Sequence, residues 1–415
     1  MAGWPIPPAY GWPEVTELVE RALAMVPPDS PDAGRLLSTL GWFNGLRDYE
    51  KARDAFERSL ASARRHGDTA LERRALANHA HVDFWHLNWH GCLEKSLAAI
   101  ELAVEADDSR TEVAARSDAA RMSAAFGDAA AARAHAARML EQAEKVRERY
   151  WLVTARVNTM WLDILEGNWA DARKLSDDAL TLQPGDARNL GSRAFLESQV
   201  GDTSKADFYL ERLLSSRRLA APAFPYEDVC VAAFIPLVDG IKGNDARFDT
   251  ALSSAEVVHS EAIVVPLLDL FTRVGEGLIA TQRADAARAE EQYALIAALR
   301  GTAVPMLGIS TDRVLGLLSF AMGHFDRAKS HFEDAIAFCR RAGYQPQYAW
   351  TAIDYADALS KSNHPGDADR AAQLQNESLK VARDLEMHAI ANHFGHNGAP
   401  LAGERTPQRA DGRGT

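Results

Sequence analysis

A series of small residues, about 40 positions apart, constrains the fold of this chain more than any other feature of its sequence. It is clearest in the segment YEKARDAFERSLASA (49–63), which has a near copy in HFDRAKSHFEDAIAFC (324–339). Both copies place a small residue, a large residue four positions later and another small residue three positions after that. Small residues let two helices approach closely, and the large residue fills the gap between them. The two sets are Ala52, Phe56 and Ser59, and Ala328, Phe332 and Ala335.

Positions equivalent to Ala52 recur along most of the chain, with successive positions 34 to 43 residues apart. A stack of helix pairs keeps such a period because each pair buries its face only against the next pair. The residue types and spacings resemble those of tetratricopeptide repeats, most closely where Leu315 and Gly316 precede the turn at Gly323. We therefore predict an all-α fold, an α-solenoid of about nine long tetratricopeptide-like helix pairs. The equivalent positions are Ala52, Cys92, Ala132, Ala172, Ala206, Ala246, Ala287, Ala328 and Ala371.

The two ends of the chain depart from this pattern. Residues 12–28 (WPEVTELVERALAMVPP) carry the second-helix pattern with no first helix before them. They form either an N-terminal cap or the start of a solenoid cut from a longer chain, and the second interpretation is favoured. From Asn392 the periodicity is lost, and Gly, Pro and Arg accumulate. We predict a disordered N-terminus at 1–11, the solenoid at 12–391 and a disordered tail at 392–415.

Composition limits the classes of function. The formal net charge is −12 and Lys and Arg form no run, so we expect no direct contact with nucleic acid. No apolar stretch approaches the ~18 residues that a membrane-spanning helix needs, so we expect no membrane partner. Cys92, Cys230 and Cys339 are odd in number and contain no CxxC pair. We expect them to be reduced thiols in a cytoplasmic protein.

Three stretches resemble the C-terminal helical repeat region of bacterial signal-transduction ATPases, which are cyclase-linked, LuxR-type or maltose-regulator-like. They are ANHAHVDFWHLNWHGCLEKSLAAIELA (77–103), DRVLGLLSFAMGHFDRAKSHFEDAIAFCRRAGYQPQYAWTAIDYADAL (312–359) and PGDADRAAQLQNESLKVARDLEM (365–387). The sequence has no GxxxxGK[ST] motif to hold phosphates. The resemblance therefore implies only the sensor or scaffold region, truncated or separately encoded. In such regulators this region is thought to bind an inducer or partner and to restrain the ATPase.

The cluster NHAHVDFWHLNWHGC contains the strongest candidate metal ligands. His79, Asp83, His86 and His90 are spaced by 4, 3 and 4 positions, which would place them on one stripe of a single helix. The repeat pattern instead predicts a turn near Leu87, so packing with local hydrogen bonds is favoured over a metal-dependent enzyme. The sequence also lacks a GxSxG elbow and a Gly-rich dinucleotide loop. We predict no catalysis, no cofactor and no bound metal.

The remaining candidate site is the concave groove, which the first helices of such a solenoid line. Arginine and aromatic residues dominate binding hot spots, and arginine suits carboxylates. We expect a non-catalytic scaffold in signalling or transcriptional regulation that binds a protein or peptide partner, with a preference for acidic ones, or a small effector. The alternative interpretation is that about half of these side chains only pack between helices. The predicted groove residues are Arg74, His81, Phe84, Trp85, Arg121, Trp161, Arg188, Phe195, Arg313 and Phe320.

Overall fold

The computed structural model describes residues 13–217, 226–261, 264–361 and 364–396, and these residues are almost entirely helical. After α1 (Pro13–Met25), nine helix pairs follow one another, and α20 (His388–His396) comes last. The first helices are α2 (Pro31–Asn44), α4 (Thr69–Trp85), α6 (Ser109–Ala125), α8 (Arg149–Glu166), α10 (Ala187–Val200), α12 (Tyr226–Ile241), α14 (Pro266–Gln282), α16 (Thr311–Ala321) and α18 (Gln345–Ser360). The second helices are α3 (Tyr49–His66), α5 (Trp89–Glu105), α7 (Ala129–Val146), α9 (Trp169–Leu182), α11 (Thr203–Arg217), α13 (Phe248–His259), α15 (Ala286–Ile296), α17 (Phe325–Ala342) and α19 (Asp367–Asp384).

The all-α solenoid of about nine helix pairs is thus confirmed within the described residues. Helix α1 lies where the sequence predicts a second helix, and residues 1–12 before it lie outside the described residues. At the other end α20 continues to His396, past the predicted boundary at 391. The proposed disordered segment 1–11 and the remaining part of the tail, 397–415, lie outside the described residues.

The small residues that anchor the second helices are buried, with two corrections. Ala52, Cys92 and Ala132 have no exposed surface, but Ala246 and Ala287 are exposed. The buried residues in their repeats are instead Ala251 and Ala289. Each lies four positions after the N-cap residue of its helix, as Ala132 does after Asp128. The prediction for α13 was too early because six residues, 242–247, separate it from α12, whereas three residues separate α6 from α7. The connection before α15 has the ordinary three residues, so the shift at Ala287 comes from the irregular spacing of the preceding repeats.

The spacing of small and large residues explains how each pair packs. A Cβ atom added to Gly41 of α2 would lie 2.9 Å from the ring of Phe56 on α3. The same relation holds between Gly316 of α16 and Phe332 of α17, at 2.8 Å. Phe56 and Phe332 are fully buried, so each glycine makes room for a phenylalanine at the centre of its pair. The two near copies in the sequence therefore have the same packing.

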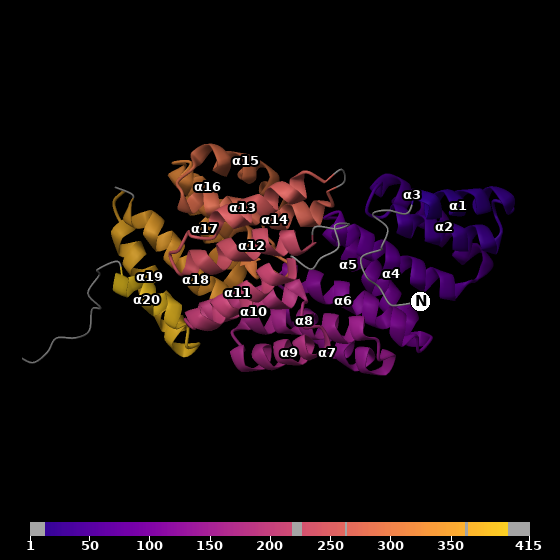
Figure 1. Ribbon diagram of the computed structural model, residues 1–415, viewed down its shortest axis with the longest axis horizontal. Coiled ribbons are helices and arrows are strands. Elements are labelled where there is room, and N and C mark those ends of the chain that lie inside the picture. Colours follow the sequence, from indigo (N-terminus) through magenta and orange to yellow (C-terminus); the bar gives the residue numbers. More distant parts are fainter. Residues whose placement is uncertain (1–12, 218–225, 262–263, 362–363, 397–415) are drawn as a thin grey trace, which may run out of the picture.

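The solenoid winds so tightly that helices from distant repeats meet (Figure 1). Helix α4 contacts α14, α8 contacts α18 and α10 contacts α20. Two hydrogen bonds join these parts: the Tyr344 hydroxyl donates to the carbonyl of Ala124 at 2.9 Å, and the Trp169 indole donates to that of Leu385 at 2.6 Å. Helices of distant repeats consequently cover part of the concave side of the first helices. No described helix is long and apolar enough to span a membrane.

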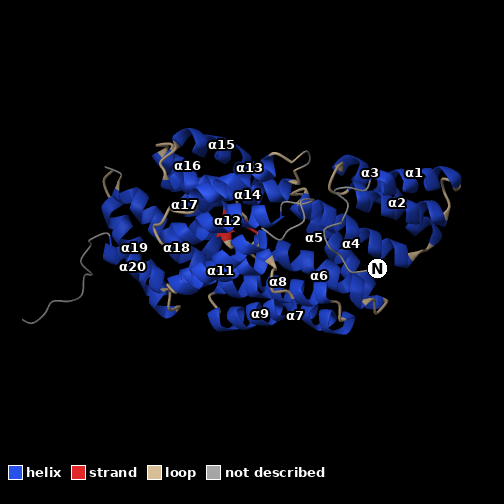
Figure 2. Ribbon diagram, viewed as in Figure 1, coloured by secondary structure: helices blue, strands red, loops and turns tan. Residues whose placement is uncertain are grey.

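A short β-hairpin lies against the first helices on this concave side. Strands β1 (Ala303–Val304) and β2 (Ile309–Ser310) pair antiparallel, with Val304 opposite Ile309, and Figure 2 shows them near the middle of the body. Every residue from 302 to 310 is buried. The hairpin lies between α15 and α16 in the sequence, where the repeat pattern predicts only a connection between helices. Its apolar side chains replace the solvent that a groove would otherwise hold.

Candidate functional site

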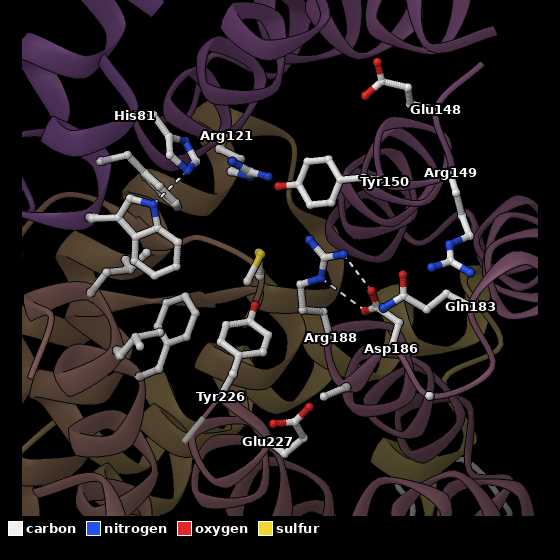
Figure 3. Close-up of a pocket in the computed structure, with 18 residues that line it drawn as sticks. His81, Arg121, Glu148, Arg149, Tyr150, Gln183, Asp186, Arg188, Tyr226 and Glu227 are labelled. Carbon is white, nitrogen blue, oxygen red and sulfur yellow. Dashed lines mark hydrogen bonds and ion pairs between the residues drawn. The ribbon is translucent and has the colours of Figure 1, made fainter. Parts of the chain in front are cut away.

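The main candidate site is a cavity of about 580 Å³ on the concave side, beside the hairpin (Figure 3). The C-terminal parts of α4 and α6 form one wall. The first turns of α8, α10, α12 and α14 form the other walls, and Met306 of the hairpin completes the lining. Because successive first helices begin at the same rim, their N-terminal side chains converge although they are far apart in sequence. The volume is in the range of sites that hold small molecules.

Arg188 forms the polar centre of the cavity. Its Nε and Nη2 donate to the two carboxylate oxygens of Asp186 at 3.1 and 2.6 Å. Burial disfavours the charge of Arg188, but the adjacent Asp186 outweighs burial and raises the pKa of the guanidinium. Nη1 makes no hydrogen bond with the described part of the chain. Arg188 is therefore held rigidly and retains N–H groups that can bind a further acceptor.

A buried network fixes the opposite wall. Asp118, which is 2% exposed, accepts hydrogen bonds from Arg121 Nη1 at 2.7 Å and from His81 Nδ1 at 2.9 Å. The Trp85 indole donates to His81 Nε2 at 2.8 Å. An indole N–H can only donate, so Nε2 is the acceptor and Nδ1 carries the proton of a neutral imidazole. The Arg121 guanidinium also lies 5.2 Å from the centre of the Phe84 ring.

Three charged residues lie at the edge of the cavity. Glu148 forms an ion pair with Arg110, outside the lining, and its Oε2 is buried with no hydrogen-bond partner among the described residues. Arg149 is exposed and forms no ion pair or hydrogen bond with the described residues. Burial raises the pKa of Glu227, which favours its neutral form. Arg149 is consequently the cation of the lining whose charge no described carboxylate balances directly.

The other lining side chains divide into tyrosines and apolar groups. Figure 3 shows Tyr150 and Tyr226 pointing into the space between Arg121 and Arg188. Burial raises the pKa of Tyr226 well above its usual value, so its hydroxyl stays protonated. The apolar part of the lining is formed by Phe84, Trp85, Leu267, Leu268, Phe271 and Met306. The cavity therefore has a polar side rich in hydrogen-bond donors and an aromatic and aliphatic side.

Half of the predicted groove residues line this cavity, namely His81, Phe84, Trp85, Arg121 and Arg188. Arg74 lies on the same helix as three of them but is exposed and outside the lining. These five residues come from α4, α6 and α10, so the periodicity located side chains that tertiary structure brings together.

The other predicted groove residues lie elsewhere. A Cβ added to Gly308, at the tip of the hairpin, would lie 3.6 Å from both Trp161 and Phe195, so the hairpin covers these two side chains. Arg313 donates to Asp354 at 2.6 Å, and Phe320 packs beside Phe325 in an edge-to-face contact with ring centres 5.6 Å apart. In these positions the side chains pack or form ion pairs between helices, as the alternative interpretation of the groove residues predicts.

The histidine-rich segment 79–90 is divided between separate environments. His79 is 2% exposed and stacks on Phe56, and burial lowers its pKa to about 4. Asp83 is fully buried and accepts hydrogen bonds from Tyr49 at 2.7 Å and Lys95 at 2.9 Å. The carboxylate that would be the central metal ligand is thus already occupied by an ammonium group and a phenol.

The last two histidines of the segment separate at the predicted turn. Helix α4 ends at Trp85, and His90 lies in α5, where it is exposed and stacks on Phe126. His86 Nε2 donates to the carbonyl of Gly45 at 2.6 Å. The four residues consequently do not share one stripe of a helix, and each is engaged in local packing or hydrogen bonds.

Another cluster brings Asp312, His331 and Asp334 within metal-binding distance of one another. Both nitrogens of His331 are engaged, Nδ1 with Asp312 at 2.9 Å and Nε2 with the Tyr293 hydroxyl at 3.0 Å. Arg300 lies between the two carboxylates, 3.0 Å from Asp334 and 3.7 Å from Asp312. A guanidinium already supplies the positive charge here, so the cluster fits a structural connection between α16, α17 and the segment before the hairpin.

More than half of the residues that line the cavity were not predicted from the sequence. These residues lie in the hairpin or at the starts of helices. The small-residue series does not indicate which side chains face the cavity at the start of a helix. A local signal did exist at 183–188 (QPGDAR), where Pro and Gly mark a turn and Asp caps the next helix. No feature of the sequence indicates that four such turns meet.

Comparison with known proteins assigns no family. No protein-family model matches the chain, and no curated protein matches it. Among solved structures, a Rap protein complexed with competence and sporulation factor shares 11% sequence identity, covering 81% of this chain and 82% of that chain, with a TM-score of 0.48. A circular tandem repeat protein with a novel repeat topology shares 14% identity, covering 91% of this chain and 100% of that chain, with a TM-score of 0.21. Both likenesses are too distant to indicate a ligand for this chain.

Proposed function

We propose that this chain is a non-catalytic scaffold whose inner cavity binds a small effector. The observation that carries the proposal is the convergence of His81, Trp85, Arg121 and Arg188 on one cavity of about 580 Å³. A partly apolar cavity with a few fixed polar groups is the usual form of a small-molecule site. The Asp118 network and the Asp186 pair hold these polar groups before a ligand arrives, which lowers the entropic cost of binding.

The hairpin favours a small effector over a long peptide. A peptide lying along the concave surface would need the space beside Trp161 and Phe195, which the tip of the hairpin occupies. The space that remains is bounded by α4, α6, α8, α10, α12 and α14. Following the sequence resemblance, we further propose that the scaffold acts as a sensor in cytoplasmic signalling or transcriptional regulation.

A variant that fills the cavity tests the proposal. Gly185 lines the cavity, and a Cβ added there would meet no atom within 4 Å, so Gly185→Phe can place a ring in the cavity without a backbone clash. The matched control is Thr181→Phe, an exposed position of α9 outside the lining. The probe is 8-anilinonaphthalene-1-sulfonate, an aromatic anion whose fluorescence rises in apolar sites.

The wild-type chain and Thr181→Phe should bind the probe at one site, and Gly185→Phe should weaken that binding at least tenfold. Circular dichroism of each variant checks that the fold is intact. Equal binding of the probe by all three folded proteins would mean that the cavity is not the binding site.

A further inference from the structure

The charges around the cavity restrict which effector it can hold, an inference that rests on the proposed function. Two of the three acidic residues in the lining are neutralised by arginines: Asp186 by Arg188, and Glu148 by Arg110. The third, Glu227, is partly buried and forms no ion pair within the described part of the chain. Desolvation disfavours the charged form of such a carboxyl group.

The basic residues are balanced differently. Arg121 is paired with Asp118 and Arg188 with Asp186, so these two contribute hydrogen-bond donors without net charge. Arg149 lies at the first position of α8 and has no acidic partner among the described residues. His81 is held between Trp85 and Asp118 in its neutral form. One unbalanced positive charge therefore remains at the polar side.

The apolar side lies across the cavity from this charge. Phe84 and Trp85 end α4, while Leu268 and Phe271 come from the first turns of α14, and all four are nearly fully buried. A ligand that is charged throughout would leave this surface without a partner, whereas an apolar ligand would cover the Nη1 donors of Arg188 without a hydrogen bond and would not use the charge of the exposed Arg149. Burying polar groups without hydrogen bonds is costly, so neither class fits the whole cavity.

We propose that the cavity binds a small amphipathic carboxylate, with its anionic end at Arg149 and Arg188 and its apolar body against Phe84, Trp85, Leu268 and Phe271. A planar carboxylate matches the two parallel N–H groups of a guanidinium. Arg149 supplies the charge for the ligand, and Arg188 supplies oriented donors. A cationic head group would be repelled by the positive charge of Arg149. A neutral head group would gain no charge attraction from it.

A series of probes with a common tail tests the head group. Decanoate, decanol and decyltrimethylammonium carry the same ten-carbon chain with anionic, neutral and cationic ends, and butyrate keeps the carboxylate with a short tail. Each is measured below its micelle concentration by displacement of 8-anilinonaphthalene-1-sulfonate from the wild-type chain. Decanoate should displace the probe at a concentration at least tenfold lower than any of the other three.

Two single substitutions locate the charge that selects the head group. Arg149→Gln should raise the decanoate concentration needed for displacement about tenfold and leave the value for decanol unchanged. Arg147→Gln is the matched control, because Arg147 is exposed two positions earlier at the end of α7 and does not line the cavity. Neither arginine is paired with described residues, so neither change should unfold the chain.

The outcomes separate this inference from the proposed function. If Gly185→Phe blocks the fluorescent probe but decanol or decyltrimethylammonium displaces it as well as decanoate does, the cavity binds effectors and the carboxylate class is wrong. Equal loss of decanoate binding in Arg149→Gln and Arg147→Gln would also overturn the assignment of Arg149. If Gly185→Phe leaves the binding of the probe unchanged, the proposed function itself fails.

Discussion

Asp118 shows how one buried carboxylate sets the shape of a binding site. It holds Arg121 and His81 through two hydrogen bonds, and His81 in turn orients the Trp85 indole. The polar and apolar sides of the cavity are thus linked through a residue that does not line it. Such positioning residues are hard to recognise in a sequence, because Asp118 is one of many acidic residues on the predicted helices.

His259 gives a prediction for the pH dependence of stability. Hydrogen bonds to Asp269 at 3.3 Å and Glu276 at 3.1 Å raise its pKa to about 9. An unfolded histidine has a pKa of about 6.5, so folding favours the protonated form. The stabilisation is complete below about pH 6.5 and is lost as the pH rises through about 9.

Thermal unfolding between pH 6 and 10 measures this contribution. The melting temperature of the wild-type chain should fall through this window by more than that of His259→Gln. His324→Gln, which changes an exposed histidine at the start of α17, should follow the wild type. Parallel curves for wild type and His259→Gln would show that the two carboxylates do not stabilise the charged imidazole.

At the scale of elements, the sequence predicted the helix pairs well because their packing is repeated. In two pairs a glycine on the first helix makes room for a phenylalanine on the second, so one pattern located both. The pairs are Gly41 with Phe56 and Gly316 with Phe332. The hairpin at 303–310 obeys no repeated rule and was missed, although Pro305 and Gly308 mark a turn there. Ala246 and Ala287 were misplaced for a related reason, since connections of irregular length shift a fixed period.

Helix α14 offers a matched pair of glycines that tests the packing. A Cβ on Gly275 would lie 2.1 Å from the carbonyl oxygen of Ala232, which belongs to the backbone of α12 and cannot rotate away. A Cβ on Gly277 would make an ordinary contact with Leu318 at 3.4 Å. Gly275→Ala should therefore lower the free energy of unfolding by about 1–3 kcal/mol or more, as overpacked cores do. Gly277→Ala should raise it by about 0.5–1 kcal/mol, because alanine favours a helix over glycine.

Urea unfolding of both variants measures these differences, with the m-value serving as a check that the unfolded state is unchanged. If Gly275→Ala were as stable as Gly277→Ala, the close approach of α12 and α14 would be wrong. That approach brings the first turns of the two helices to the same rim of the cavity, so the geometry of the site depends on it.

At the scale of the whole molecule, the closure of the solenoid could not be predicted from the sequence. The path of a repeat protein follows from small rotations between neighbouring repeats, which accumulate along the chain. The residue pattern fixes which faces pack but not these angles. The contact of Tyr344 with Ala124 and that of Trp169 with Leu385 are results of the accumulated path. Arg74 and Arg188 therefore looked equivalent in the sequence, yet only Arg188 reaches the cavity.

Segments far apart in the sequence are proposed to form one effector site, and hydrogen–deuterium exchange with and without decanoate measures whether they respond together to a ligand. The first amides of a helix have no partner within the helix, so ligand contact should slow their exchange measurably. We predict slower exchange in the first turns of α8, α10, α12 and α14, the last turn of α4 and the hairpin tip around Met306. Slower exchange confined to outer helices such as α3 and α17, with exchange in these turns unchanged, would show that the ligand does not bind at the proposed site.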